Sequence, residues 1–263
     1  MIDKYPSRVG CQSYLMPVSR HWPDDGQYCK YGYTALKSFV SSVTIDRIKA
    51  NEKWMHTVKE PHTNAVRTAL AVHQNSDVVQ IVSDLTEIAE NILESGVYIH
   101  QSRINFKAPG ESSGWSWHSD FETWHTQDGM PEMRALTAMI ALDANTSENG
   151  PLRVIPGSHS WYWADKRPDQ EVTPEQHFAD QKTGVPNSEV IKRLEDECLP
   201  AIDIHLNSGD VLLFDCNLMH SSQPNNSKEW RRNLFIVFNS VENKLVNAFS
   251  YSYNRPETMA ARG

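Results

Sequence analysis

The chain has 263 residues, enough to bury a sizeable core within one large β-rich domain. Its formal net charge of −8 argues against a broad surface for nucleic acid or an anionic membrane, and it favours a small-molecule substrate. No apolar run is long enough to cross a bilayer, and the first residues lack the pattern of a signal peptide. The four cysteines are widely spaced, which indicates reduced thiols. We therefore expect one cytoplasmic domain over residues 1–263.

The amino-terminal part has little periodic pattern. Residues 1–32 contain three prolines among aromatic and polar residues, so we interpret them as an extended arm that lies over the domain surface. The segment 39–48 carries apolar residues at mixed spacing, which we interpret as a helix. These first elements are expected to flank the core.

The clearest helix is predicted over residues 77–93. Its apolar residues recur at the i, i+3, i+4 spacing of a buried helix face, Ser76 or Asp77 can cap its start, and Gly96 can end it. Residues 97–107 follow, with β-branched and aromatic residues between polar ones, as is typical of a strand whose two faces differ.

The second half of the chain is a series of short apolar runs between turn residues. The excursion at 161–200 is polar and irregular, with one helix expected near 188–195. The other segments have the length and composition of strands, and they cover residues 134–142, 152–155, 202–206, 211–215 and 233–239. Because the strands are short and do not alternate with helices, we predict a mainly β fold with flanking helices and a double-stranded β-helix (jelly-roll, cupin-like) core.

One histidine and one carboxylate stand two residues apart, among aromatic residues. In a strand, His118 and Asp120 would point to the same face, so both could reach one metal ion. A third ligand-type residue, His220, follows a strand-like run about a hundred residues later. Two histidines and one carboxylate form the facial triad of non-haem Fe(II) oxygenases. A His-x-Asp pair alone is weak evidence, since such pairs also hydrogen-bond to each other at surfaces.

Other residues of the sequence could bind the co-substrate 2-oxoglutarate beside this metal site. The far carboxylate of this co-substrate needs a fixed cation, and the planar guanidinium of Arg231 suits it. Only one of Arg231 and Arg232 can point inward from a strand. Ser222 could donate its hydroxyl to the same carboxylate or be an ordinary turn serine, and Lys107 is a second cation or an exposed lysine.

Several segments of the sequence resemble those of a known enzyme family. The chain resembles the ectoine hydroxylases, within the phytanoyl-CoA dioxygenase superfamily, over most of residues 66–263. The likeness lies in an ordered series of segments, at residues 97–105, 118–125, 128–131, 133–136, 149–152, 156–159, 214–217 and 239–243. So long an ordered match is specific for iron and 2-oxoglutarate chemistry, and less specific for the substrate.

The resemblance implies a role for nine positions of this sequence. The implied iron ligands are His118, Asp120 and His220. The implied co-substrate contacts are Arg231, Ser222 and Lys107. The implied substrate contacts are Gln101, Trp124 and Phe235. Each substrate contact has a structural alternative, as a core aromatic or as a glutamine bonded to a neighbouring strand or a water. The resemblance gives no ligand role to the nearby residues Glu122, His125 and Asp128.

These expectations combine into one function. We expect an Fe(II)- and 2-oxoglutarate-dependent dioxygenase that uses O2 to hydroxylate a small zwitterion, with ectoine converted to 5-hydroxyectoine as the leading hypothesis. The alternatives are a hydroxylase of a free amino acid such as proline, and a non-catalytic jelly-roll binding protein. Trp115, where the family usually has phenylalanine, and the short stretch 53–66 leave the substrate open. No nucleic-acid or membrane partner is expected, and a homodimer is allowed.

Overall fold

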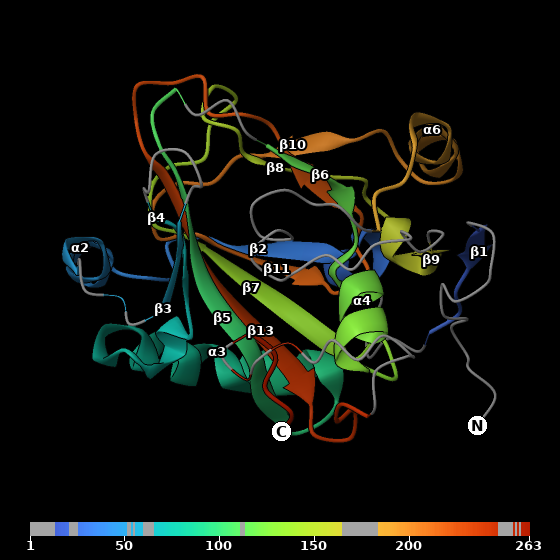
Figure 1. Ribbon diagram of the computed structural model, residues 1–263, viewed down its shortest axis with the longest axis horizontal. Helices are drawn as coiled ribbons and strands as arrows, with labels where there is room; N and C mark the ends of the chain where they lie inside the picture. The colour runs from blue at the N-terminus through green and yellow to red at the C-terminus, as the bar shows by residue number, and fades with distance from the viewer. Residues whose placement is uncertain are drawn as a thin grey trace.

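Two antiparallel sheets form the body of the protein, which we describe from a computed structural model (Figure 1). The structure describes residues 14–20, 26–51, 54, 56–59, 66–110, 114–164, 184–246, 255, 257 and 259–263. The larger sheet has seven strands in the order β2-β11-β7-β13-β5-β4-β3. Their bounds are β2 Tyr33–Leu36, β3 His56–Lys59, β4 Val66–Leu70, β5 Val97–Lys107, β7 Ala135–Ala141, β11 Val211–Asp215 and β13 Arg231–Ser240.

The smaller sheet lies over one face of the larger one (Figure 1). Its four strands run in the order β10-β8-β12-β6, and all neighbours are antiparallel. They are β6 Trp115–His118, β8 Leu152–Val154, β10 Ile202–Ile204 and β12 His220–Ser222. Side chains from both sheets meet in one apolar cluster, which includes Met139, Val154, Phe214 and Phe235. This arrangement is the double-stranded β-helix core that the sequence predicts.

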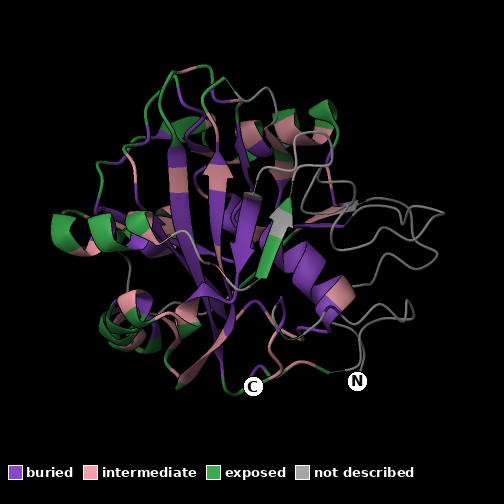
Figure 2. Ribbon diagram, turned by 60° about the vertical axis from the view of Figure 1, so that its left-hand side comes forward, coloured by how far each residue is buried: buried purple, intermediate pink, exposed green. Residues whose placement is uncertain are grey.

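Helices cover the outer face of the large sheet and the ends of the molecule. The amphipathic helix α3 packs Val78, Ile81 and Leu85 against residues of β7 and β13, and its outer face is exposed (Figure 2). The helices are α1 Gln27–Tyr31, α2 Ser42–Ala50, α3 Ser76–Leu93, α4 Asp120–Thr123 and α6 Ser188–Glu197, with short turns η1 Val72–Gln74, η2 Trp124–Asp128 and η3 Ser158–Ser160.

The end signals of α3 differ from the prediction. Asn75 caps the helix, because its side-chain oxygen accepts a hydrogen bond from the backbone N–H of Asp77 at 2.9 Å. At the other end Glu94, and not Gly96, adopts the left-handed conformation that closes the helix. The helix therefore starts and stops within two residues of the expected positions.

The described part of the amino-terminal arm is docked onto the domain. Tyr14–Pro17 form β1, which pairs antiparallel with Trp161–Ala164, the strand β9. The sequence did not predict β9 within the polar excursion, and residues 165–183 of that excursion lie outside the described residues. Most of the short stretch 53–66 also lies outside them. Among the described residues, no helix is both long and apolar enough to span a bilayer.

Candidate active site

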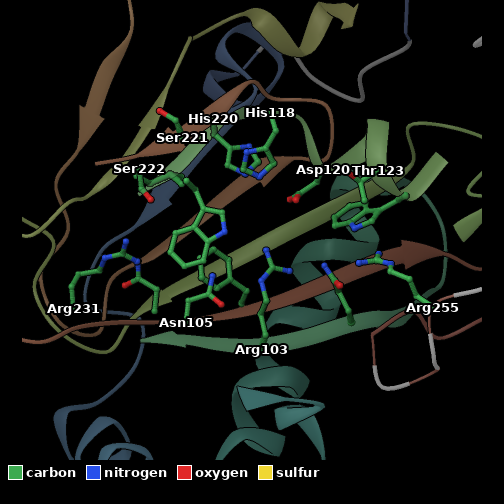
Figure 3. Close-up of a pocket in the computed structure, with 16 residues that line it drawn as sticks. Arg103, Asn105, His118, Asp120, Thr123, His220, Ser221, Ser222, Arg231 and Arg255 are labelled. Atoms are coloured by element: carbon green, nitrogen blue, oxygen red, sulfur yellow. The ribbon is translucent and has the colours of Figure 1, made fainter. Parts of the chain in front are cut away.

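Three ligand-type side chains converge where the small sheet meets α4. His118 ends β6, Asp120 begins α4 and His220 begins β12. His118 and His220 are partners across the antiparallel β6–β12 pair, and their ring centroids lie 4.2 Å apart. The ligand atoms of all three residues lie within 4.8 Å of one another, and all three residues are buried (Figure 3).

Asp120 reaches this cluster by a different route from the one expected. We expected His118 and Asp120 to be alternate residues of one strand, but β6 ends at His118. Ser119 has extended backbone and caps α4, since its hydroxyl accepts a hydrogen bond from the backbone N–H of Glu122 at 3.4 Å. A strand-to-helix turn therefore brings the carboxylate beside the imidazole, and the strand interpretation was wrong.

Backbone carbonyls fix the ring orientation of both histidines. Nδ1 of His118 lies 2.7 Å from the Ser116 carbonyl oxygen, and Nδ1 of His220 lies 2.8 Å from the Leu218 carbonyl oxygen. A carbonyl can only accept, so each Nδ1 carries a proton, and Nε2 is the ring nitrogen left to bind a metal. Burial, with a further contribution from nearby His220, lowers the pKa of His118 to about 3. A neutral imidazole of this kind is a common metal ligand.

One oxygen of the Asp120 carboxylate suits contact with a cation. Its Oδ2 atom is buried and has no hydrogen-bond partner among the described residues. A buried carboxylate oxygen without a partner is costly, and a metal ion would satisfy it. The donor set of two imidazoles and one carboxylate fits Fe(II) and leaves other positions of the metal open for small ligands.

Two neighbouring long strands, β5 and β13, build the floor of the pocket below this cluster. Residues at alternate positions of a strand point to the same side, and here they are partners across the β5–β13 pair. The pairs are Lys107 with Arg231, Asn105 with Asn233, Arg103 with Phe235 and Gln101 with Val237. Most of these side chains line the pocket.

Positive charge gathers at one end of this floor. Arg231 is buried and lines the pocket, and Lys107 is fully buried beside it in the strand pair. The Lys107 ammonium donates to the Ser222 hydroxyl at 2.9 Å and lies 5.4 Å from the centroid of the Trp115 ring. Two of the three residues that the resemblance assigns to the co-substrate, Arg231 and Ser222, therefore line one end of the pocket (Figure 3), and Lys107 lies behind Ser222.

The two adjacent arginines have different environments. Arg231 donates to the Gly150 carbonyl at 2.9 Å, whereas Arg232 pairs with Asp143 at 2.7 Å outside the pocket. Gly150 has a positive φ of 69°, and a Cβ there would collide with the Gln223 carbonyl oxygen. Only glycine can therefore bring this carbonyl to the Arg231 guanidinium.

Aromatic side chains gather toward the other end of the pocket. Trp124 is buried in η2 and meets the His100 ring edge-on, with centroids 5.2 Å apart. The Arg103 guanidinium lies over the Phe235 ring at 4.8 Å. Gln101 bridges this guanidinium and the Met259 carbonyl when its amide nitrogen faces that carbonyl. The three proposed substrate contacts all line the pocket.

Sequence reasoning missed two pocket arginines. Arg103 could have been found, because polar residues occupy four successive alternate positions of the predicted strand, from Gln101 to Lys107. Burial lowers the pKa of Arg103. Arg255 gave no local signal: it lines the pocket, and its Nε donates at 2.7 Å to Asp128, which lies 127 residues earlier.

Asp128 forms a buried ionic group behind the aromatic end. Its carboxylate pairs with two nitrogens of Arg255 and lies 3.3 Å from Nε2 of His100. Burial alone would raise the pKa of Asp128, yet Arg255 and then His100 more than offset it and hold that pKa below its ordinary value. Asp128 thus touches a residue of the pocket without touching the triad.

The two other polar residues near the triad in sequence are buried outside the cluster of ligand atoms. His125 is buried, donates from Nδ1 to the Met130 carbonyl at 2.6 Å and stacks on Phe121 with centroids 5.1 Å apart. Glu122 is fully buried within α4. Neither residue belongs to the cluster of ligand atoms.

Comparisons with known proteins agree with this geometry. The family model described as phytanoyl-CoA dioxygenase (PhyH) matches residues 28–233. An ectoine dioxygenase from Sphingopyxis alaskensis is 35% identical to this chain, over 100% of this chain and 94% of that relative.

Solved structures of related proteins superpose closely on this chain. A crystal structure of EctD from S. alaskensis with 2-oxoglutarate and 5-hydroxyectoine superposes with a TM-score of 0.83 at 33% identity, covering 99% of this chain and 95% of that chain. A structure of EctD from S. alaskensis with bound Fe superposes with a TM-score of 0.82 over the same shares of both chains, also at 33% identity.

Proposed function

We propose that this protein hydroxylates ectoine, from the premise that the chain belongs to the phytanoyl-CoA dioxygenase family. It is a 2-oxoglutarate-dependent dioxygenase that uses Fe(II). The observation that carries the proposal is the position of the His118, Asp120 and His220 cluster beside a pocket whose lining includes arginines at both ends and aromatic rings between them.

The three cluster residues would hold the metal, and their environment supports that role. Both imidazoles are held with Nε2 available, and the buried Asp120 carboxylate supplies the negative charge. Bound Fe(II) supplies the activation of O2 that couples oxidative decarboxylation of 2-oxoglutarate to hydroxylation of a C–H bond. The burial of the cluster keeps bulk water away from it.

The cationic end would dock the co-substrate. Arg231 would meet the far carboxylate of 2-oxoglutarate, with Lys107 adding positive charge and Ser222 a hydroxyl at the same end. This docking leaves the 2-oxo acid end of the molecule to face the metal cluster. The overall reaction balances: one oxygen atom of O2 enters the hydroxyl group, the other enters succinate, and carbon dioxide leaves.

The aromatic end suits the chemistry of ectoine. Ectoine has a delocalised amidinium cation and a carboxylate, so ring faces can hold the cation while polar groups orient the ring. Trp124 provides a ring face and Gln101 an amide, while the Phe235 ring carries the Arg103 guanidinium at 4.8 Å. The name of the Sphingopyxis relative and the 5-hydroxyectoine in the EctD structure support 5-hydroxyectoine as the product.

A substrate panel tests this proposal. Fe(II)-loaded protein is incubated with 2-oxoglutarate and O2 in the presence of ectoine, proline or other small amino acids, and succinate and product mass are measured. We expect ectoine to gain one oxygen atom with matched formation of succinate. A hydroxylated amino acid in place of hydroxylated ectoine would favour the proline-type alternative. Iron binding without turnover of any substrate would favour a binding protein.

Organisation and location are part of the same proposal. The seven-stranded sheet joins segments from residue 33 to residue 240, which supports one domain over 1–263. The cysteines that the structure describes are all free thiols, which supports a reducing compartment such as the cytoplasm. A homodimer is the proposed assembly, and the mass in solution by light scattering tests it.

A further inference from the structure

The loop between β11 and β12 carries the third cluster residue. It runs from Asp215, the last residue of β11, to His220, the first residue of β12. Its turn is organised by Asp215, whose Oδ1 accepts from the Asn217 backbone N–H at 2.8 Å and whose carbonyl accepts from the Leu218 backbone N–H at 3.0 Å. The Leu218 carbonyl in turn accepts from Nδ1 of His220. The Asp215 turn therefore sets the carbonyl that orients the imidazole.

The same loop also holds the element that carries Asp120. The Cys216 carbonyl accepts a hydrogen bond from the backbone N–H of Phe121 at 2.8 Å, and Phe121 directly follows Asp120 in α4. One short segment thus contacts the supports of two of the three cluster residues. A shift of this segment would move the His220 ring and the start of α4 together.

Arg20 fastens this segment from the amino-terminal part of the chain. Its Nη1 donates to Oδ2 of Asp215 at 3.0 Å, and its Nη2 donates to Oδ1 at 2.8 Å. The same two nitrogens donate to the carbonyls of Met133 at 2.9 Å and His159 at 3.1 Å. The guanidinium therefore joins four acceptors from three separate parts of the fold.

Burial and charge favour an arginine beside the Asp215 carboxylate. The exposed fraction of the side chain is 11% for Arg20 and 2% for Asp215. Burial alone would lower the pKa of Arg20, but the Asp215 carboxylate more than offsets it and raises that pKa. The guanidinium stays charged, and its planar donors match a carboxylate in a way that a lysine ammonium cannot. Backbone pairing of β1 with β9 brings Arg20 to this place.

We propose that Arg20 and Asp215 are positioning residues for the metal site, so that the amino-terminal segment helps to set the affinity for iron. The proposal rests on the proposed function, because it assigns the cluster to a metal. Residues that orient metal ligands without touching the metal contribute to affinity, since a ligand held in place loses less freedom on binding. Arg20 and Asp215 act in this way through the His220 and Asp120 supports.

The test measures metal binding without turnover. Metal-free protein is titrated anaerobically with Co(II), whose visible absorption bands report the ligand geometry, and apparent Kd values are compared. We expect Asp215→Asn and Arg20→Gln each to raise the Kd for Co(II) by about tenfold, within the usual range for such supporting residues. Arg20→Lys, which keeps the charge but not the planar donors, should give a smaller increase.

Asp210 offers a matched control at the other end of β11. It is also a buried aspartate that accepts from loop backbone N–H groups, at Ser38 and Asn207, and pairs with a cation, Lys37. Asp210→Asn should leave the Kd for Co(II) within about twofold of wild type, with a similar loss of thermal stability. Equal Kd values for Asp215→Asn and Asp210→Asn would overturn the proposal.

Three further outcomes are distinct. If Asp215→Asn does not fold, the Arg20→Lys and Arg20→Gln variants decide, and an unchanged Kd in both would overturn the proposal. Wild-type protein that binds Co(II) but hydroxylates no ectoine would contradict the proposed substrate and leave the positioning role intact. Wild-type protein that binds no Co(II) would contradict both.

Discussion

The metal end and the floor of the pocket are built in different ways. The three candidate metal ligands stand at the ends of β6, α4 and β12, where turns direct the side chains. The floor comes from the middle of two long neighbouring strands, β5 and β13. A metal ion needs donors that meet at one point, which turns can provide. A strand pair offers a row of side chains about 7 Å apart along one face, which suits an extended organic acid.

Because the two regions are built differently, substitutions in them should affect ligand binding differently. Displacing one donor at the metal end affects the whole cluster, because all ligand atoms lie within 4.8 Å. On the floor, each alternate position contacts a different part of the pocket, so a substitution should affect one ligand and spare the other. Substitutions in the two regions should therefore differ in the size and the selectivity of their effects.

The largest effect should come from the metal end. Asp120→Ala removes the only carboxylate of the cluster, so we expect coupled turnover to fall by more than the roughly hundredfold that supporting residues cost. Succinate and product formation under saturating Fe(II) measure it. Activity close to wild type would remove Asp120 from the metal site.

The Asp128–Arg255 pair should dominate stability at the substrate side. Asp128→Asn leaves a buried Arg255 without its counter-charge, and breaking such a pair costs about 3–5 kcal/mol. Urea unfolding of metal-free protein measures the loss, and the KM for substrate should rise because Arg255 lines the pocket. Asp196→Asn, in an exposed pair with Lys192, is the control that should leave unfolding unchanged.

The same pair predicts a pH dependence. The folded-state pKa of Asp128 lies below the ordinary value of 3.8, so its contribution to stability is present above about pH 4. That contribution is lost as the pH falls through the lowered pKa. The unfolding free energy of wild type should therefore drop more steeply below pH 4 than that of Asp128→Asn, and parallel curves would contradict the assignment.

An intermediate effect is expected at the cationic end of the floor. Arg231→Ala removes a hydrogen bond to a charged group, worth about 1.5–3 kcal/mol, which corresponds to a rise of roughly ten- to hundredfold in the KM for 2-oxoglutarate. Arg232→Ala, whose side chain pairs with Asp143 outside the pocket, should leave that KM unchanged. The reverse result would exchange the roles of the two arginines.

The smallest effect should come from the aromatic end. Trp124→Ala removes one ring face, and a cation–π contact is worth about 0.5–2 kcal/mol, so the KM for ectoine should rise roughly two- to thirtyfold. Co(II) binding should stay at the wild-type level, because Trp124 is not part of the ligand cluster. An equal loss of Co(II) binding would show that this ring supports the fold of the metal end.

Much of the fold could be predicted from local patterns. The strand over residues 97–107 has the same bounds in the structure, and the helix over 77–93 begins one residue earlier. Both follow from a repeated burial pattern along one segment, which depends only on near neighbours in the chain. The short strand β9 was missed, because it forms by pairing with β1, and no local pattern shows a distant partner.

The residue types of the candidate site came from the sequence, and their arrangement came from the tertiary structure. His118, Asp120 and His220 could be selected by chemistry and spacing, although a turn and not a strand brings Asp120 to the histidines. The ion pairs of Arg255 with Asp128 and of Arg20 with Asp215 join residues 127 and 195 positions apart. Such contacts exist only once the chain has folded, because their energy depends on burial and geometry that no single segment possesses.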